Sequence, residues 1–196
     1  LDGVTAVLRE GCPAPVTVEC IGDVPLPDTG LVTIVDVCGT PTLSWEGDVS
    51  DGNICPEVIT RTYRLTDFYG NFAECAQTIT VDDTTPPSIA CPAPISVQCI
   101  GDVPAPDTGL VIASDNCSTV SVTWIGDVSD ANACPELITR TYRAIDACGN
   151  INDCAQAITV DDTTPPSIAC PAPISVQCIG DVPAPDTGLV VASDNC

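Results

Sequence analysis

The chain contains no histidine and no methionine, and its five basic residues are all arginines, so lysine is absent as well. Against them stand 27 acidic residues, which gives a formal net charge of −22 at pH 7. Such a chain offers no basic face to neutralise nucleic-acid phosphates or an anionic membrane surface. Without histidine, Ser/His/Asp and Cys/His nucleophile pairs are excluded. We therefore expect no enzymatic activity, no nucleic-acid partner and no direct membrane insertion.

Aromatic residues are also scarce, at 4% of the chain, although hydrophobic residues make up 44%. The apolar content is mainly Val, Ile, Ala and Cys, and Val and Ile favour β-strands. Small cores of this kind need covalent support, which the 14 cysteines can supply as disulfides. Structural zinc is the rival use of cysteine, but it prefers CxxC pairs or histidine, and neither occurs. Disulfides predict an extracellular or cell-surface location.

Internal repetition is the strongest signal in the sequence. Residues 91–111 and 170–190 are identical, residues 12–32 are a diverged copy, and the copies begin 79 residues apart. We predict an irregular N-terminal segment at 1–11, modules at 12–90 and 91–169, and the first strands of an incomplete third module at 170–196. A piece this short cannot bury its own core. We therefore expect further residues of the chain or another subunit to complete it.

The pattern within one repeat alternates strands with turns. In the second repeat, strands are predicted at 88–99 (kinked by its two prolines), 110–114, 120–125, 137–145 and 155–160. Short strands and regularly spaced turns favour an all-β fold of tandem immunoglobulin-like β-sandwich modules, disulfide-stabilised and with a 79-residue repeat. On this fold, Trp45 and Trp124 are expected in the sandwich core beside a disulfide.

Cysteine pairing is a hypothesis, because six cysteines allow fifteen connectivities. Antiparallel strand order places the cysteines of each repeat at two opposite ends, and we predict pairs that share an end. The predicted bridges are Cys91–Cys154, Cys99–Cys134 and Cys117–Cys148 in the second repeat, with Cys12–Cys75 and Cys20–Cys55 in the first. Tyr69 stands where the second repeat has Cys148, so Cys38 is expected to be a free thiol or to form an intermolecular bridge.

Acidic and amide residues gather where one repeat is predicted to meet the next. Carboxylate and amide oxygens are ligands that calcium prefers. The sequence therefore predicts a structural calcium site at this junction, although Asp and Asn also favour turns without any ion. The candidate ligands are Asp82, Asp83, Asp115, Asn116, Asp146 and Asn150, with Asp36 and Asp67 in the first repeat and Asp161, Asp162 and Asp194 near the third.

These motifs together resemble a known family. DDTTPPSIACP, ASDNC and AIDACGN, followed by an alternating strand and a second DDTTPP, resemble hyalin repeats. More narrowly, they resemble HYR-like immunoglobulin-fold modules of giant surface proteins of Bacteroidota. The resemblance implies a cell-surface or secreted array used in adhesion, gliding or fibres, without catalysis. Thr84 and Thr163 lie in Asp-Thr-Thr sequences that resemble the O-glycosylation motif of the same bacteria.

Two functions compete on this evidence. The first is a structural array in an extracellular fibre, stalk or surface adhesin, stabilised by disulfides and calcium and polymerised with other copies of itself. The second is an adhesin module that binds a surface glycan or protein. The recurrent Asp-Thr-Gly (28–30, 107–109 and 186–188) is interpreted as a turn, because the catalytic use of this tripeptide needs two aspartates in one dyad.

Overall fold

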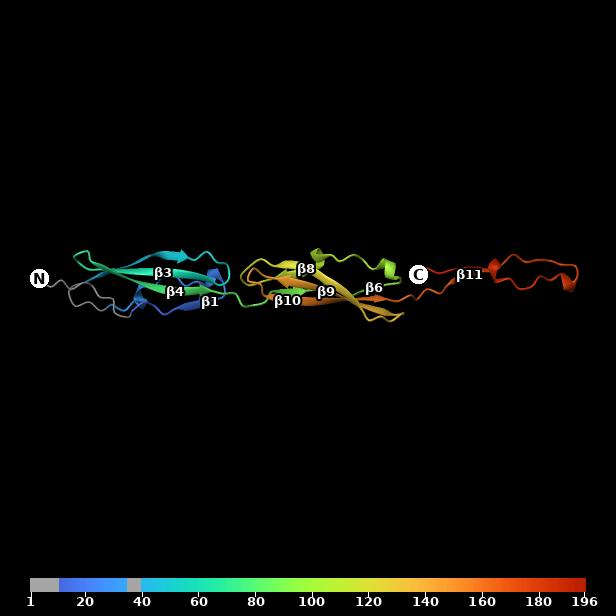
Figure 1. The fold of residues 1–196 in the computed structure, drawn as a ribbon, viewed down its shortest axis with the longest axis horizontal. Helices are drawn as coiled ribbons and strands as arrows, with labels where there is room; N and C mark the ends of the chain where they lie inside the picture. The colour runs from blue at the N-terminus through green and yellow to red at the C-terminus, as the bar shows by residue number, and fades with distance from the viewer. Residues whose placement is uncertain (1–10, 35–39) are drawn as a thin grey trace. The chain divides into compact units, whose positions relative to one another are not determined.

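The computed structural model describes residues 11–34 and 40–196, and its regular elements are strands and short 3-10 turns. In the first repeat the strands are β1 (Val16–Val18), β2 (Thr42–Ser50), β3 (Glu57–Thr66) and β4 (Phe72–Val81). They form one sheet in the order β1-β4-β3-β2, in which β1 runs parallel to β4 and the other pairs are antiparallel. Figure 1 shows β3 and β4 side by side. The all-β part of the prediction is confirmed.

The second repeat forms the same sheet from the corresponding residues. The remaining strands are β5 (Ser88–Ala90), β6 (Ile95–Val97), β7 (Ile112–Ser114), β8 (Ser121–Ser129), β9 (Glu136–Ile145), β10 (Ile151–Val160), β11 (Ser167–Ala169) and β12 (Val191–Ser193). The strand order in the second sheet is β6-β10-β9-β8, and β6 runs parallel to β10. Two smaller antiparallel sheets pair β5 with β7 and β11 with β12.

The single strand predicted across 88–99 is therefore two strands, β5 and β6, which belong to different sheets. Pro92 and Pro94 lie between them. Proline cannot donate a ladder hydrogen bond, so it ends the pairing of β5 before β6 begins. The arrangement of these sheets as an immunoglobulin-like sandwich remains a prediction.

One face of each four-stranded sheet carries the core. Along β3 the side chains of Ile59, Arg61, Tyr63 and Leu65 are buried, in the alternation expected of a half-buried strand. Loops cover this face: the backbone N–H of Asp28 donates to the Tyr63 hydroxyl at 3.3 Å. The second repeat has the same core and the same contact between Asp107 and Tyr142.

The aspartate in each of these contacts belongs to the Asp-Thr-Gly tripeptide. Asp28 Oδ1 accepts from the N–H of Gly30 at 2.8 Å and caps the 3-10 turn η2 (Thr29–Leu31). Asp107 and Asp186 do the same for η4 (Thr108–Leu110) and η6 (Thr187–Leu189). The interpretation of this tripeptide as a turn is confirmed.

The tryptophans do not lie in the core, so that expectation is wrong. Trp45 is 48% exposed and Trp124 is 47% exposed. Both lie on strands at the edge of their sheets, and the indole N–H of Trp45 donates to Asp48 Oδ1 at 3.0 Å. A β-bulge between Trp45 and Gly47 interrupts the register there. The indole is thus held by a surface carboxylate and not by apolar packing.

Contacts divide the structure into two compact units that do not follow the sequence repeats. The first unit comprises the described residues of 11–90 together with Ile112–Thr123 and Arg143–Asp153, and the second comprises Cys91–Val111, Trp124–Tyr142 and Cys154–Cys196. Segments 112–123 and 143–153 of the second repeat thus pack with the first repeat. The domain boundaries drawn from the sequence remain a prediction. Among the described residues, no helix is long and apolar enough to cross a bilayer.

Candidate functional site

Two of the five disulfides formed by the described residues close loops within a single repeat, as the sequence predicts. Cys12 pairs with Cys75, and Cys91 pairs with Cys154 at the equivalent positions. Each bridge spans 63 residues and connects the start of a repeat to its last long strand.

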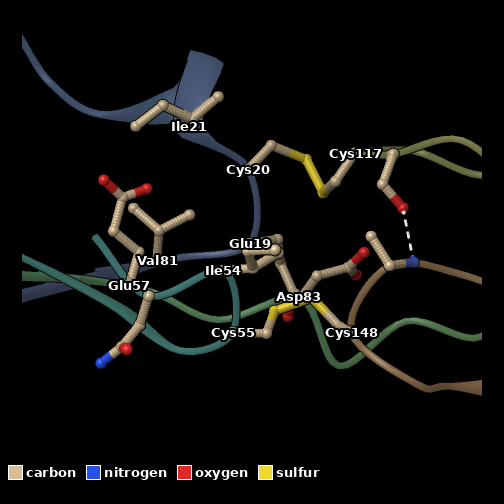
Figure 2. A pocket seen from close by; sticks show the side chains of 13 residues that line it. Glu19, Cys20, Ile21, Ile54, Cys55, Glu57, Val81, Asp83, Cys117 and Cys148 are labelled. Atoms are coloured by element: carbon tan, nitrogen blue, oxygen red, sulfur yellow. Dashed lines mark hydrogen bonds between the residues drawn. A yellow bond between two sulfur atoms is a disulfide. The ribbon is translucent and has the colours of Figure 1, made fainter. Parts of the chain in front are cut away.

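The other two disulfides of the first unit cross from one repeat to the next, and here the predicted pairing is wrong. Cys20 pairs with Cys117, not with Cys55, and Cys55 pairs with Cys148. Figure 2 shows the two bridges on opposite walls of one hollow. Antiparallel strand order predicts that Cys20 lies near Cys55 and that Cys117 lies near Cys148, but the disulfides join one of these pairs to the other. The Cα atoms of the cysteines bridged across the repeat boundary lie 5.0 and 5.3 Å apart, as close as the 5.8 and 5.6 Å of the bridges within one repeat.

In the second unit, the predicted Cys99–Cys134 bridge is also wrong, because Cys99 pairs with Cys196. This bridge repeats Cys20–Cys117, and both span 97 residues. Among the described residues, Cys134, Cys170 and Cys178 form no disulfide. Cys38, expected as a free thiol or an intermolecular bridge, lies outside the described residues.

Asp83 lies between the two crossing disulfides, in the extended segment that follows β4 (Figure 2). Only 4% of this residue is exposed. Its Oδ1 accepts from the N–H of Thr85 at 3.1 Å, whereas its buried Oδ2 has no hydrogen-bond partner among the described residues. A buried carboxylate oxygen without a donor needs a proton, a water molecule or a cation.

Asp115 supplies a second oxygen of the same kind. Its Oδ2 accepts from the N–H groups of Cys117 and Ser118 at 2.9 and 3.0 Å, and its buried Oδ1 has no partner in the described structure. Ligand atoms of Asp83, Asp115 and Cys117 lie within 4.8 Å of one another. The Cys117 sulfur is already bonded to Cys20, so the two carboxylates are the available anionic ligands.

A hairpin turn completes the cluster. Asp146, 7% exposed, accepts from the N–H groups of Cys148 and Asn150 at 2.9 and 2.8 Å. Gly149 has a φ of 90°, which favours glycine at that position of the turn. The Asn150 side-chain amide donates to the Asp83 backbone carbonyl at 2.7 Å and to Asp146 Oδ2 at 2.9 Å. The hairpin that carries Cys148 is thus fastened to the segment that carries Asp83.

The electrostatics of the cluster oppose the ionisation of Asp83. Burial raises the pKa of Asp83, and the negative charges of Asp115 and Asp146 raise it further. Backbone hydrogen bonds from Cys117 and Ser118 lower the pKa of Asp115, so that carboxylate stays ionised. The pair can share one proton, or it can bind a divalent cation that neutralises both charges.

Of the eleven predicted metal ligands, Asp83 and Asp115 present unpartnered oxygens at one point, with Asp146 and Asn150 beside them. Asn116 is exposed, and its amide donates to the Cys117 sulfur at 2.9 Å. Asp67 accepts the turn hydrogen bonds of its own hairpin, in the pattern of a turn residue. Outside this cluster lie Asp82, Asp161, Asp162 and Asp194, while Asp36 falls outside the described residues.

Sequence reasoning missed Glu19. Its carboxylate accepts from the N–H of Thr84 at 2.8 Å and from the Thr84 hydroxyl at 3.0 Å, and its pKa is lowered, first by the Thr84 N–H. Gln98 makes the equivalent contact with the N–H of Thr163 at 3.0 Å. The Glu-to-Gln exchange at one repeat position was the available signal. Both threonine residues are exposed, and their glycosylation remains a prediction.

Comparison with known families gives a match to part of the chain. Residues 11–81 match the family described as the HYR-like domain with 4 cysteines. Over this stretch the HYR-like part of the sequence resemblance is confirmed. Cys12, Cys20, Cys55 and Cys75 of the matched stretch all form disulfides. No curated protein matches the chain significantly.

Proposed function

We propose that the chain is a structural repeat array of an extracellular fibre, stalk or surface adhesin, in which disulfides fasten each repeat to the next. The observation that carries the proposal is the pair of crossing bridges, Cys20–Cys117 and Cys55–Cys148. The five disulfides and the HYR-like match support an extracellular or cell-surface location.

Two crossing bridges change the mechanics of the connection between repeats. A peptide linker alone leaves torsional freedom, whereas two disulfides add two covalent routes beside it. In the chain-entropy description, a bridge that closes a loop of about 100 residues stabilises the folded state by about 4–5 kcal/mol. Tension on a repeat joined in this way passes through these sulfur–sulfur bonds and bypasses the long strands β2, β3 and β4.

Force spectroscopy of single chains tests this proposal. In the oxidised protein, the shortest covalent route from Cys12 to Cys196 uses residues 12–20 and 99–117 and the bridges Cys20–Cys117 and Cys99–Cys196. The extension should therefore stop at roughly 100 Å, and rise to roughly 600 Å after reduction, at about 3.5 Å per residue. Bridges confined to single repeats would allow roughly 200 Å in the oxidised protein, and that result would contradict the proposal.

Calcium is the second part of the proposal. We place it at the oxygens of Asp83 and Asp115, next to Asp146, because two buried carboxylate oxygens there have no donor in the described structure. Calcium takes oxygen ligands and would compensate the charge that raises the Asp83 pKa. Calorimetric titration of chelator-treated protein should give saturable calcium binding. A flat titration at millimolar calcium would remove this part and leave the disulfide part intact.

A glycan-binding adhesin is the alternative, and the half-exposed tryptophans favour it. The Trp124 indole N–H donates to Asp127 Oδ1 at 3.0 Å, which holds the exposed ring beside a carboxylate. A half-exposed indole offers an apolar face on which a ligand with an apolar face of its own can pack. Screening against a glycan array tests the alternative: binding that Trp124→Ala abolishes would support it, and no bound glycan would count against it.

A further inference from the structure

The second unit contains a hollow that repeats the one between the crossing disulfides. Its lining includes Gln98, Cys99, Ile100, Cys134 and Asp162. These positions follow Glu19, Cys20, Ile21, Cys55 and Asp83 by 79 residues, and those five line the first hollow. The far wall of the first hollow is made by Ser118, Ala147 and Cys148. Cys196, which follows Cys117 by 79 residues, lines the second hollow as Cys117 lines the first. None of the residues that line the second hollow corresponds to Ala147 or Cys148.

Of the two crossing disulfides that line the first hollow, one has its counterpart already formed in the second unit. Cys99 is bonded to Cys196, and the amide of Asn195 donates to the Cys99 sulfur at 3.5 Å. Asn116 makes the same contact with Cys20, also at 3.5 Å. At the position of the other disulfide there is an exposed thiol: Cys134 Sγ donates to Asp161 Oδ1 at 3.3 Å, and its counterpart Cys55 is bonded to Cys148.

We propose that this hollow receives an Asp-Ala-Cys-Gly-Asn hairpin of a further repeat and that Cys134 forms a disulfide with the hairpin cysteine. In this step one small-molecule disulfide oxidises the thiols of Cys134 and of the hairpin cysteine to a protein disulfide. The small-molecule disulfide is reduced to two thiols, which take up the two electrons and the two protons. The hairpin at 146–150 defines the recognition. Asn150 donates to the Asp83 carbonyl in the first unit, and the corresponding carbonyl of Asp162 lies 3.9 Å from the Cys134 sulfur.

This inference rests on the proposed structural function and extends it into a specific linkage. The test is a chain lengthened after Cys196 by a copy of residues 118–169, folded with oxidised glutathione and mapped by mass spectrometry. Cys134 should be found bonded to the appended copy of Cys148. A matched control replaces that appended cysteine by Tyr, the residue at position 69, and should leave Cys134 open to alkylation.

A second experiment uses the present chain, so the result does not depend on folding of the extension. A peptide with the sequence of residues 143–153, its cysteine activated as a thiopyridyl disulfide, should couple to Cys134 at least tenfold faster than to Cys178. A scrambled peptide should show no such preference. Equal rates at both cysteines, or an alkylatable Cys134 in the lengthened chain, would overturn the inference. Either result would leave the Cys20–Cys117 and Cys55–Cys148 bridges, and hence the proposed function, untouched.

Discussion

At the scale of single residues, Asp83 is the point where charge and burial conflict. Its folded-state pKa is raised by burial and by the charges of Asp115 and Asp146. A carboxyl group with a raised pKa favours the folded state at low pH and loses that contribution as the pH rises through the folded-state pKa. Without a cation, ionised Asp83 therefore destabilises the protein at neutral pH.

Replacing Asp83 by Asn distinguishes the two ways in which the charges of Asp83 and Asp115 can be compensated, a shared proton or a bound cation. In chelator at pH 7, Asp83→Asn should stabilise the protein by about 1 kcal/mol, because it removes a buried charge. In millimolar calcium the wild type should gain stability and the variant should not. Thermal unfolding with and without calcium measures both effects. Asp162→Asn, at the equivalent and less buried position, is the control, and equal calcium responses of wild type and Asp83→Asn would contradict the site.

A buried arginine gives the second prediction at this scale. Arg140 is 3% exposed and pairs with Asp127 at 2.8 Å, and this contact lowers the pKa of Asp127. Asp127→Asn should cost about 3 kcal/mol, because it leaves a buried charge unpaired. Urea unfolding measures the loss. Asp153→Asn, which breaks the exposed pair with Arg143, should cost less than about 1 kcal/mol.

The pH dependence of that loss has a defined sign. Asp127 has a lowered folded-state pKa, so its contribution is present above the unfolded-state value of about 3.9 and disappears as the pH falls through the folded-state pKa. The stabilities of wild type and Asp127→Asn should therefore converge in strong acid. A difference that stayed constant from neutral pH to strong acid would exclude the ion pair as its cause.

At the scale of elements, each four-stranded sheet depends on loops to cover its apolar face. The Tyr142 hydroxyl accepts from the N–H of Asp107 and ties one of these loops to β9. Tyr142→Phe should destabilise the second unit by about 1 kcal/mol through the lost hydrogen bond. Tyr69→Phe, at a side chain that is 80% exposed, should leave the unfolding midpoint unchanged. Equal effects of the two substitutions would show that this hydrogen bond does not hold the loop.

Strand positions were predictable because alternation and proline are local signals. The strands at 137–145 and 155–160 correspond to β9 and β10, and the two prolines that kink 88–99 mark the gap between β5 and β6. The exposure of Trp45 and Trp124 was not predictable in the same way. It depends on the edge position of each strand and, at Trp45, on a bulge, which arise from pairing between strands and not from the local sequence.

At the scale of the whole molecule, the sequence identified the cysteines of the junction but not their partners. Strand order places Cys20 and Cys55 at one end of a repeat and Cys117 and Cys148 at the opposite end of the next. All four line one hollow, so spacing along the chain cannot choose among the possible pairs. The choice depends on how neighbouring segments pack, which repetition in sequence does not encode. Likewise, the sequence predicted Asp83 and Asp115 as metal ligands, but it did not predict that each would keep one carboxylate oxygen without a hydrogen-bond partner.

Non-reducing peptide mapping of the 196-residue chain distinguishes disulfides that cross from one repeat to the next from disulfides within one repeat. Cleavage with an aspartate-specific protease, under acidic conditions that block thiol exchange, should release peptides that join Cys20 to Cys117 and Cys55 to Cys148. Peptides that join Cys20 to Cys55 and Cys117 to Cys148 would contradict crossing disulfides, because each repeat would then be closed on itself and tied to the next by its backbone alone.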